Sequence, residues 1–397
     1  MRETLKNLLR ILLSTTALLA TLPSVAAAAF PGENGKIAMR CSELRSAVCV
    51  TEPGSHVTTY LTDAARYEAM PAFSANGRRI AFMREAGPGA GSGHTEIFVM
   101  RANGTQVERL THTAPPVGNS YPSFTPDGSQ IVFRREGQIM IMDADGSGVE
   151  QIGAGREPAV SPTGERVAFT RDDDPGLGGV HLYTMAIDGS DVQPVADPGD
   201  NWTAGDPSWS PDGEEVVFTY FAGAPTFEQG VFSVPFSGGD PERVGPAQLP
   251  GEGDTYEPTF SPDGTQVAFV GNDCADAECP QSLYASALDG SALTDLGTAD
   301  PGADPDWGVR TPVGEPPSGR CNGKEATIVG TTRDDSILGT SSRDVISARG
   351  GSDVVKGLAG NDVLCGGKGK DRINGGGGTD RCSGGARDRL RSCERRG

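Results

Sequence analysis

The heptapeptide PSWSPDG stands at residues 207–213 and is followed, after two glutamates, by the apolar run VVF at 216–218. Related seven-residue patterns begin at residues 71, 122, 158 and 258, and each is followed by a short apolar run. Asn-Gly and Asp-Gly pairs supply the positive φ angles that tight hairpin turns require. Each copy therefore predicts a strand, a tight turn and a second strand.

The spacing of these copies predicts a repeat architecture, because each opens a unit of 36 to 51 residues. Most units contain a later apolar strand that ends at another Asn-Gly or Asp-Gly pair, so a unit forms an antiparallel sheet of about four short strands. One such sheet cannot bury both of its faces, and repeated sheets solve this by packing radially as propeller blades. The alternative is a β-sandwich whose hairpins share the pattern by chance.

The two ends of the repeat region indicate how the ring closes. Residues 30–38 contain the turn and second strand of a unit but lack its first strand. The missing strand is predicted at Asp304–Trp307, which matches the register of Asp206–Trp209. We therefore expect an all-β fold with a six-bladed β-propeller over residues 30–310, whose first blade is completed by a C-terminal strand that leaves no open edge.

These repeats resemble the TolB-type propeller family, whose SPDG turn stands here at 210–213 and 261–264, with weaker copies from 74, 125 and 161. The resemblance covers residues 30 to 308 and concerns turn and packing residues, so it is specific for fold and not for function. It implies a scaffold that binds other proteins, as the family's envelope member does, while related propellers cap peptidases.

A nine-residue period follows a Pro- and Gly-rich linker, which we place at residues 311–320. Each repeat carries an aspartate with an apolar side chain or Cys two residues later, and a shortened seventh copy ends at Asp388 and Leu390. The aspartates of this period are Asp335, Asp344, Asp353, Asp362, Asp371 and Asp380. Two repeats make one turn of a flattened parallel β-roll, so residues 321–397 are predicted to form a C-terminal parallel β-roll whose loops stack eighteen residues apart.

The period resembles the RTX, or haemolysin-type, calcium-binding nonapeptide, over residues 330 to 392. The resemblance implies Ca²⁺ as the cofactor, and since calcium takes six to eight oxygen ligands, two stacked loops are needed for one ion. The loops nearest the pattern predict one site between those of Asp353 and Asp371 and another between those of Asp362 and Asp380. The predicted metal-site residues are Asp353, Asp362, Asp371, Asp380, Gly351, Gly360, Gly369 and Gly378.

Charge divides the chain into two parts. The formal net charge is −19, yet residues 321–397 carry +4 and residues 30–320 about −25. Basic residues within or beside the loops, such as Lys368, Lys370 and Arg372, oppose a divalent cation and predict weak affinity. The alternative is a roll held by disulfides with partly metal-free loops. The acidic balance of the whole chain argues against a nucleic-acid partner.

The first 29 residues read as a signal peptide, with a basic start, an apolar run at 11–22 and small residues ending at Ala29. That run is too short to span a bilayer, so an uncleaved anchor is the less favoured alternative and no membrane span is expected. Export to the extracellular space or cell envelope predicts disulfides among the eight cysteines. We expect pairs 41–49 and 274–279 and, among three connectivities left open for the last four cysteines, favour 321–365 and 382–393.

Catalytic motifs such as G-x-S-x-G, H-E-x-x-H and C-x-x-C are absent from the sequence. The four histidines are expected to be solvated loop residues. We therefore predict a secreted, non-catalytic binding or scaffold protein, with a protein or glycan ligand at the acidic propeller. The alternative is an extracellular hydrolase or lyase that uses carboxylates in the propeller channel, where nothing in the spacing selects a pair. The oligomeric state stays open.

Overall fold

The computed structural model describes residues 31–41, 46–55, 57–63, 65–87, 93–172, 179–195, 202–223, 228–249, 253–272, 281–296, 304–310, 320–340, 342–393 and 395–396. These residues form strands and turns, with no helix among them. In that part of the chain there is accordingly no helix long and apolar enough to cross a membrane. The predicted signal peptide, residues 311–319 of the predicted linker, and the Cys274–Cys279 pair lie outside the described residues.

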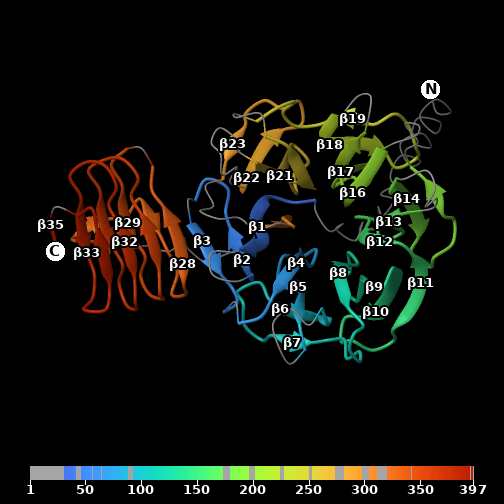
Figure 1. Ribbon diagram of the computed structural model, residues 1–397, viewed down its shortest axis with the longest axis horizontal. Coiled ribbons are helices and arrows are strands. Elements are labelled where there is room, and N and C mark those ends of the chain that lie inside the picture. Colours follow the sequence, from blue (N-terminus) through green and yellow to red (C-terminus); the bar gives the residue numbers. More distant parts are fainter. Residues whose placement is uncertain are drawn as a thin grey trace, which may run out of the picture.

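Five separate four-stranded antiparallel sheets are arranged around one axis (Figure 1). They consist of β4 (Glu68–Phe73), β5 (Arg79–Glu85), β6 (Thr95–Arg101) and β7 (Glu108–Arg109); β8 (Asn119–Phe124), β9 (Gln130–Arg135), β10 (Gln138–Asp143) and β11 (Glu150–Ala154); β12 (Arg156–Val160), β13 (Arg166–Arg171), β14 (His181–Ala186) and β15 (Gln193–Pro194); β16 (Trp202–Trp209), β17 (Glu215–Ala222), β18 (Glu228–Pro235) and β19 (Glu242–Arg243); and β20 (Thr255–Phe260), β21 (Gln266–Asn272), β22 (Gln281–Ala287) and β23 (Thr294–Asp295).

The remaining propeller strands belong to an eight-stranded sheet that continues into the C-terminal region. Its order is β24 (Asp306–Val309), β1 (Asn34–Cys41), β2 (Ala47–Thr51), β3 (Val57–Tyr60), β28 (Asp335–Leu338), β30 (Val354–Lys356), β32 (Arg372–Asn374) and β34 (Arg389–Arg391). The predicted propeller is confirmed, but this order gives five separate four-stranded blades and not the six that the sequence predicts. Five sheets stand alone, because β28 pairs with β3 and removes the edge at which a sixth sheet would end.

The predicted closing strand is confirmed by the pairing of β24 with β1. The two strands are antiparallel, with Ile37 opposite Trp307 and Ala38 opposite Asp306. The Trp307 side chain is fully buried in a cluster that also contains Ile37, Met39 and Leu283. Residues near the two ends of the propeller therefore share one sheet and one core.

The C-terminal region is a β-solenoid of two facing parallel sheets. One is the distal half of the eight-stranded sheet, and the other contains β27 (Ile328–Val329), β29 (Val345–Ser347), β31 (Val363–Cys365), β33 (Arg381–Ser383) and β35 (Arg395–Arg396). A short hairpin of β25 (Arg320–Cys321) and β26 (Lys324–Glu325) precedes them. Pairing joins residues eighteen positions apart along most of the roll, such as Ile337 with Val355 and Ile346 with Leu364, as the nine-residue period predicts.

The two regions have different cores. In the propeller the second strand of each separate sheet buries a phenylalanine, namely Phe82, Phe133, Phe169, Phe218 and Phe269. These rings fill the wedges between neighbouring blades. The roll core is a single file of smaller side chains between its two sheets, including Ile337, Ile346, Val355, Leu364 and Ile373.

Three predicted disulfides are present. Cys41 pairs with Cys49, Cys321 with Cys365 and Cys382 with Cys393. The first ties β1 to β2, the second fastens the β25 strand to the roll, and the third closes the last turn of the roll. The favoured connectivity of the four C-terminal cysteines is thereby confirmed.

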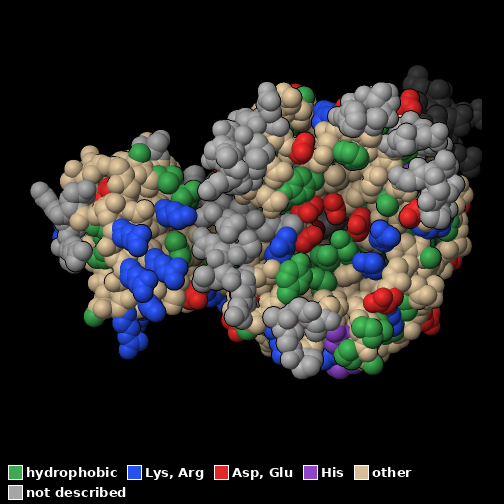
Figure 2. Space-filling model, in the orientation of Figure 1, with side chains coloured by type: hydrophobic (Ala, Val, Ile, Leu, Met, Phe, Trp, Pro, Cys, Tyr) green, Lys and Arg blue, Asp and Glu red, His purple; other side chains and the backbone are tan. Residues whose placement is uncertain are grey.

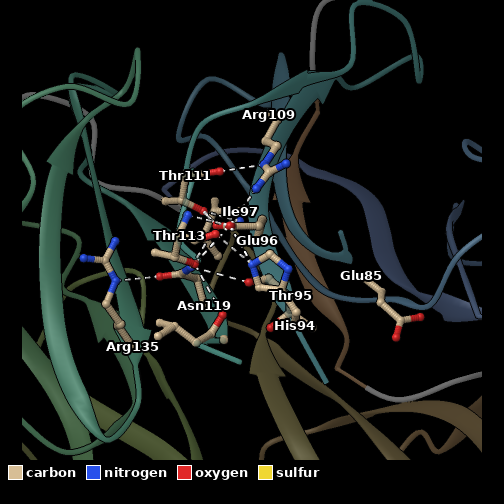
Figure 3. Close-up of polar contacts among 12 residues, drawn as sticks. Glu85, His94, Thr95, Glu96, Ile97, Arg109, Thr111, Thr113, Asn119 and Arg135 are labelled. Atoms are coloured by element: carbon tan, nitrogen blue, oxygen red, sulfur yellow. Dashed lines mark hydrogen bonds and ion pairs between the residues drawn. The ribbon is translucent and has the colours of Figure 1, made fainter. Parts of the chain in front are cut away.

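A buried polar cluster joins the sheet of β6 to the sheet of β8 (Figure 3). The fully buried Glu96 carboxylate accepts hydrogen bonds from Arg109 Nη2 (2.7 Å), Thr113 N (2.7 Å) and Asn119 Nδ2 (2.8 Å), and also from the Thr111 hydroxyl. Burial opposes ionisation of Glu96, but these hydrogen bonds outweigh it and lower its pKa. Asn119 lies on β8, so the carboxylate links two blades.

The expectation that the histidines are solvated is wrong for His94. It is 4% exposed, and its Nε2 lies 3.0 Å from Glu96 Oε1 and 3.1 Å from the Thr113 carbonyl oxygen. Both partners are acceptors, so this nitrogen carries the proton. This burial has no signal in the sequence, since Thr111 and Thr113 reach Glu96 only after β6 and β7 have paired.

Candidate functional site

The innermost strand of each separate blade carries a β-bulge. The bulge lies at the residue before a proline that recurs at the same position of every repeat. The register of each inner strand shifts there in all five separate sheets. The residues before these prolines, with the corresponding residue before β24, have positive φ: Met70, Tyr121, Glu157, Asp206, Glu257 and Asp304. A bulge re-aims side chains and is typical of functional sites. Here it turns one residue per inner strand toward the axis.

These six residues and the prolines that follow them line an axial pocket of about 130 Å³. Four of the six are acidic: Glu157, Asp206, Glu257 and Asp304. Figure 2 shows acidic side chains gathered at the centre of the propeller face. We call these four residues the acidic ring.

Hydrogen bonds between blades hold the acidic ring in place. The backbone N–H of Asp206 donates to Glu157 Oε2 (3.1 Å), and that of Asp304 donates to Glu257 Oε2 (2.6 Å). The backbone N–H of Met70 donates in turn to Asp304 Oδ2 (3.3 Å). Three of the four carboxylates, those of Glu157, Glu257 and Asp304, are therefore positioned by a backbone N–H of a neighbouring blade. The Asp206 carboxylate instead accepts a hydrogen bond from the Thr219 hydroxyl on β17 of its own sheet (3.2 Å), so the pocket is preformed.

The acidic ring concentrates negative charge with little compensation. Arg40 Nε lies 3.9 Å from Asp304 Oδ2, while among the described residues no Lys, Arg or His lies within ion-pair distance of the other three carboxylates. Burial raises the pKa of Glu257 to about 7, and the charge of Asp304 adds to this. Burial, and then the charges of Glu157 and Glu257, raise the pKa of Asp206 well above its ordinary value. A cationic group entering the pocket would relieve this repulsion.

A second candidate site lies in the loops of the roll, where the predicted aspartates stack. The backbone N–H of Asp353 donates to Asp371 Oδ1 (3.0 Å), and that of Asp362 donates to Asp380 Oδ1 (3.0 Å). Asp335 and Asp344 donate in the same way to Asp353 and Asp362 (2.9 Å each). The structure thus brings together the two pairs of loops that the sequence predicts as calcium sites.

The second carboxylate oxygen separates two classes of loop. Oδ2 of Asp353, Asp362 and Asp371 is buried and accepts no hydrogen bond from the described residues. In the first two repeats the corresponding oxygen is satisfied within its own loop, because the backbone N–H groups of Thr331 and Thr340 donate to it (2.6 Å each). In the later loops a buried carboxylate oxygen is therefore free to bind a cation. In the first two loops the corresponding oxygen already accepts a hydrogen bond.

Glycines shape the later loops for close approach. Gly351, Gly360, Gly369 and Gly378 have φ between 120° and 144°, in the region that favours glycine. A Cβ at Gly369 would overlap the Gly351 carbonyl oxygen, and one at Gly378 would overlap that of Gly360. Backbone carbonyls of stacked loops are thus brought beside the carboxylates.

These residues fit calcium. Burial raises the pKa of Asp353 to about 8 and also raises those of Asp362 and Asp371, as expected for carboxylates that lack a counter-ion. No group of three or more His, Cys, Asp or Glu side chains in metal-binding proximity occurs among the described residues. Coordination would therefore need backbone carbonyls as well, and calcium accepts such oxygens.

The sequence alone did not identify the acidic ring. Its members are one residue from each repeat, at the position before the proline, and that column reads Met, Tyr, Glu, Asp, Glu, Asp. Reading the repeats as aligned columns would have exposed this acidic position. Its direction toward the axis depends on the bulge, which the residue types do not predict.

Comparison with known proteins supports both sequence resemblances. The RTX calcium-binding nonapeptide repeat family model, in four copies, matches residues 329–364 and 357–386. An uncharacterized protein of Agrobacterium fabrum is 33% identical over 140 residues, which are 32% of this chain and 47% of that protein. A TolB homologue of Chlorobium luteolum is 33% identical over 151 residues, which are 36% and 31%. The chain thus spans less than half of the length of either relative.

Among solved structures, TolB from Acinetobacter baumannii aligns with a TM-score of 0.57 at 18% sequence identity, over 71% of this chain and 68% of that one. At this identity the alignment shows a shared fold. The predicted TolB-like propeller and RTX repeats are both confirmed, and the RTX repeats indicate calcium binding.

Proposed function

We propose that the protein is an exported, non-catalytic binding protein with a partner site at the axial pocket of its propeller and calcium sites in its roll. The observation that carries the proposal is the acidic ring. Its four residues share a positive φ, and three of its carboxylates are held by backbone hydrogen bonds from neighbouring blades. A preformed, concave and charged site of this kind suits a ligand with a matching charge. The favoured partner is a protein that inserts a cationic segment, with a cationic group of a glycan as the other possibility.

We propose that β24, β1, β2 and β3 form the sixth blade of the ring. Three features support this count. The four strands have the same antiparallel order as the separate sheets, β24 carries the innermost position, and Asp304 completes the acidic ring.

For the roll, we assign calcium to the stacked loops of Asp353 with Asp371 and of Asp362 with Asp380. Bound calcium would neutralise the buried carboxylates and join loops that are eighteen residues apart. The chain's own part is to bury these oxygens and to present carbonyls at Gly351, Gly360, Gly369 and Gly378, where a side chain would block the approach.

The pocket proposal is tested with immobilised full-length protein exposed to extracellular and envelope fractions. We expect a partner that is retained by the native protein and lost by the variant Glu157→Gln/Glu257→Gln, since both changes remove charge and keep shape. The matched control is Glu136→Gln/Glu165→Gln, which removes two carboxylates from outside the pocket lining. Equal retention by all three proteins would contradict a partner site at the axial pocket.

The calcium proposal is tested by titration calorimetry of the full chain. Asp371→Asn should abolish one binding event, whereas Asp344→Asn should keep both, because Thr340 already satisfies the Asp344 carboxylate. Loss of the same number of ions in both variants would contradict the assignment.

A hydrolase or lyase remains the second candidate, and the raised pKa of Glu257 favours it, since a carboxyl group with a pKa near 7 suits acid catalysis. Screening glycan and peptide substrates, with and without calcium, separates the two functions. Turnover that disappears in a single acidic-ring variant would establish the enzyme.

Export rests on residues 1–29. The three disulfides and the lack of a spanning helix in the described part of the chain are compatible with an extracellular or envelope location. Sequencing the N-terminus of the protein from culture medium tests this step, with a start near Phe30 expected.

A further inference from the structure

Basic residues are unevenly distributed around the roll. The repeats alternate between its two sheets, and those leading into and forming β28, β30, β32 and β34 contain nine Lys and Arg, at 333, 349, 356, 368, 370, 372, 387, 389 and 391. The interleaved repeats of β29, β31 and β33 contain two, Arg343 and Arg381, and β35 at the end of the same sheet adds Arg395 and Arg396. One sheet and the loop edge that leads into it are therefore basic.

Seven of these nine side chains are exposed, and Figure 2 shows Lys and Arg side chains gathered on the roll. Among the described residues none of the nine forms an ion pair with an acidic side chain. Asp334 is the one exposed acid on the same repeats, since Asp335, Asp353 and Asp371 are buried and Asp388 is half-buried. The positive charges thus repel one another without local compensation, in a chain whose net charge is −19.

The strands arrange part of this charge in a row along the roll. Arg372 on β32 lies directly opposite Arg389 on β34, and both side chains point away from the core because the intervening Ile373 and Leu390 face inward. Neighbouring strands are about 4.8 Å apart. Lys356 and Arg391 occupy a parallel row on β30 and β34, with Asn374 between them.

We propose that this basic face binds an extended anionic polysaccharide. Guanidinium groups recognise carboxylate and sulfate oxygens with paired, charge-assisted hydrogen bonds, and the strand spacing resembles the length of one sugar unit in an extended chain. A polymer with a charge on each unit can therefore place two neighbouring charges against Arg372 and Arg389. This site lies on the roll and is independent of the axial pocket.

Other anionic partners fit the face less well. Residues 321–397 contain no Phe, Tyr or Trp, so the aromatic platforms on which bases of single-stranded nucleic acid stack are missing. Leu358 is the one large apolar side chain of the described roll with a high exposure, which leaves little to insert into a membrane. A regular row suits a repeating polymer better than the irregular surface of a folded protein.

The test measures binding of the full-length protein to polygalacturonate and to dextran sulfate, with neutral dextran as the control polymer, at one fixed free calcium concentration and low salt. The first variant is Arg372→Gln/Arg389→Gln. Its matched control is Arg343→Gln/Arg381→Gln, which removes the same charge from exposed positions of the other repeats. Melting temperatures establish that both variants fold.

We expect binding of at least one charged polymer, weakened about tenfold or more by the first variant and within about twofold of native in the control. Binding of polygalacturonate alone would assign a carboxylated polymer, and binding of dextran sulfate alone a sulfated one. Equal weakening in both variants, no binding to either polymer, or tighter binding to single-stranded DNA or to anionic lipid vesicles would overturn the proposal. The axial-pocket variant Glu157→Gln/Glu257→Gln should bind the polymers normally, so failure here is distinct from failure of the partner site.

Discussion

Aspartates in the propeller turns are satisfied by hydrogen bonds, whereas Asp353, Asp362 and Asp371 in the later roll loops each keep a buried oxygen that accepts none from the described residues. In the propeller, Asp145 accepts hydrogen bonds from the hydroxyl (2.7 Å) and the backbone N–H (2.9 Å) of Ser147, and the hydroxyl bond is the larger cause of its lowered pKa. In the roll, Asp353 has one buried oxygen without a hydrogen bond, and burial raises its pKa to about 8. The propeller turns are therefore satisfied by groups of the chain itself, whereas these roll loops leave buried carboxylate oxygens that a cation from solution could satisfy.

The cores differ in the same sense. Large aromatic side chains fill the propeller, while the roll has a single file of small apolar residues between two narrow sheets. A thin core supplies little stabilisation per residue. The disulfides Cys321–Cys365 and Cys382–Cys393 supplement it.

The largest expected effect is on the propeller, from loss of its closing strand. Trp307→Ala should destabilise the propeller by about 3–5 kcal/mol, because it empties a large, fully buried aromatic site. Thermal unfolding followed by near-ultraviolet circular dichroism measures this. Deleting residues 303–397 should lower the melting temperature further than deleting 320–397, since the longer deletion removes β24 from beside β1. Equal melting temperatures for the two truncated proteins would contradict closure through β24.

The next largest effect is expected from the buried polar cluster around Glu96, which links two blades. Glu96→Gln should destabilise the propeller by about 2–3 kcal/mol, because the half-buried Arg109 partner loses its counter-charge and the neutral amide cannot accept every hydrogen bond that the buried Glu96 carboxylate accepts. Urea denaturation at pH 7 measures the change. Glu108→Gln, an exposed residue beside Arg109, is the control and should change stability little. If Glu96→Gln left the urea denaturation of the propeller unchanged, the result would contradict a stabilising role of the buried polar cluster.

Calcium should distinguish the two regions directly. At free calcium 100-fold above the dissociation constant, each site stabilises the folded roll by about 2.7 kcal/mol. Hydrogen exchange of the full chain should therefore show slower exchange for amides of β30 to β33 and no change for β8 to β10. Asp371→Asn should reduce this protection and Asp344→Asn should retain it. Equally slowed hydrogen exchange in both regions would contradict a calcium effect that is confined to the roll.

The smallest expected effect is the pH dependence of the propeller. Glu257 has an ordinary pKa of 4.5 and a pKa of about 7 in the folded protein, so the folded state binds its proton more tightly than the unfolded state. The resulting stabilisation is complete below about pH 4.5 and is lost as the pH rises through 7, and the part lost between about pH 6 and 7 is about 1 kcal/mol. Glu257→Gln should flatten melting temperature against pH without abolishing the slope, because Asp306 also has a pKa raised to about 7 by burial. An unchanged slope would contradict the charge crowding assigned to the ring.

Much of this architecture is predictable from the sequence because it is periodic. The turn motif near 210–213 and the aspartates nine residues apart specify hairpins and roll, and the match of Asp304–Trp307 to Asp206–Trp209 specifies the closing strand. The features that could not be predicted from the sequence depend on contacts between repeats. Neither the burial of His94 nor the pairing of β28 with β3 has a signal within one repeat, since each needs partners from a distant part of the chain.

For the candidate sites the same distinction holds. The stacking of the roll loops was predictable because their aspartates and glycines stand at fixed spacing, and the structure adds which buried carboxylate oxygens accept no hydrogen bond from the described residues. The acidic ring was not predicted, because Glu157 and Glu257 lie one hundred residues apart and meet only through bulges in two inner strands.

The pairing of β28 with β3 makes the roll an outgrowth of the propeller instead of a domain on a tether. Three residue pairs join the strands, from Asp335 opposite Thr59 to Ile337 opposite Val57, and Val57 packs against the roll core. Each further pair of nonapeptides would add one strand, about 4.8 Å, to the same sheet. The number of repeats thus sets the distance between the tip of the roll and the propeller. Adding repeats would leave the contacts within the propeller unchanged.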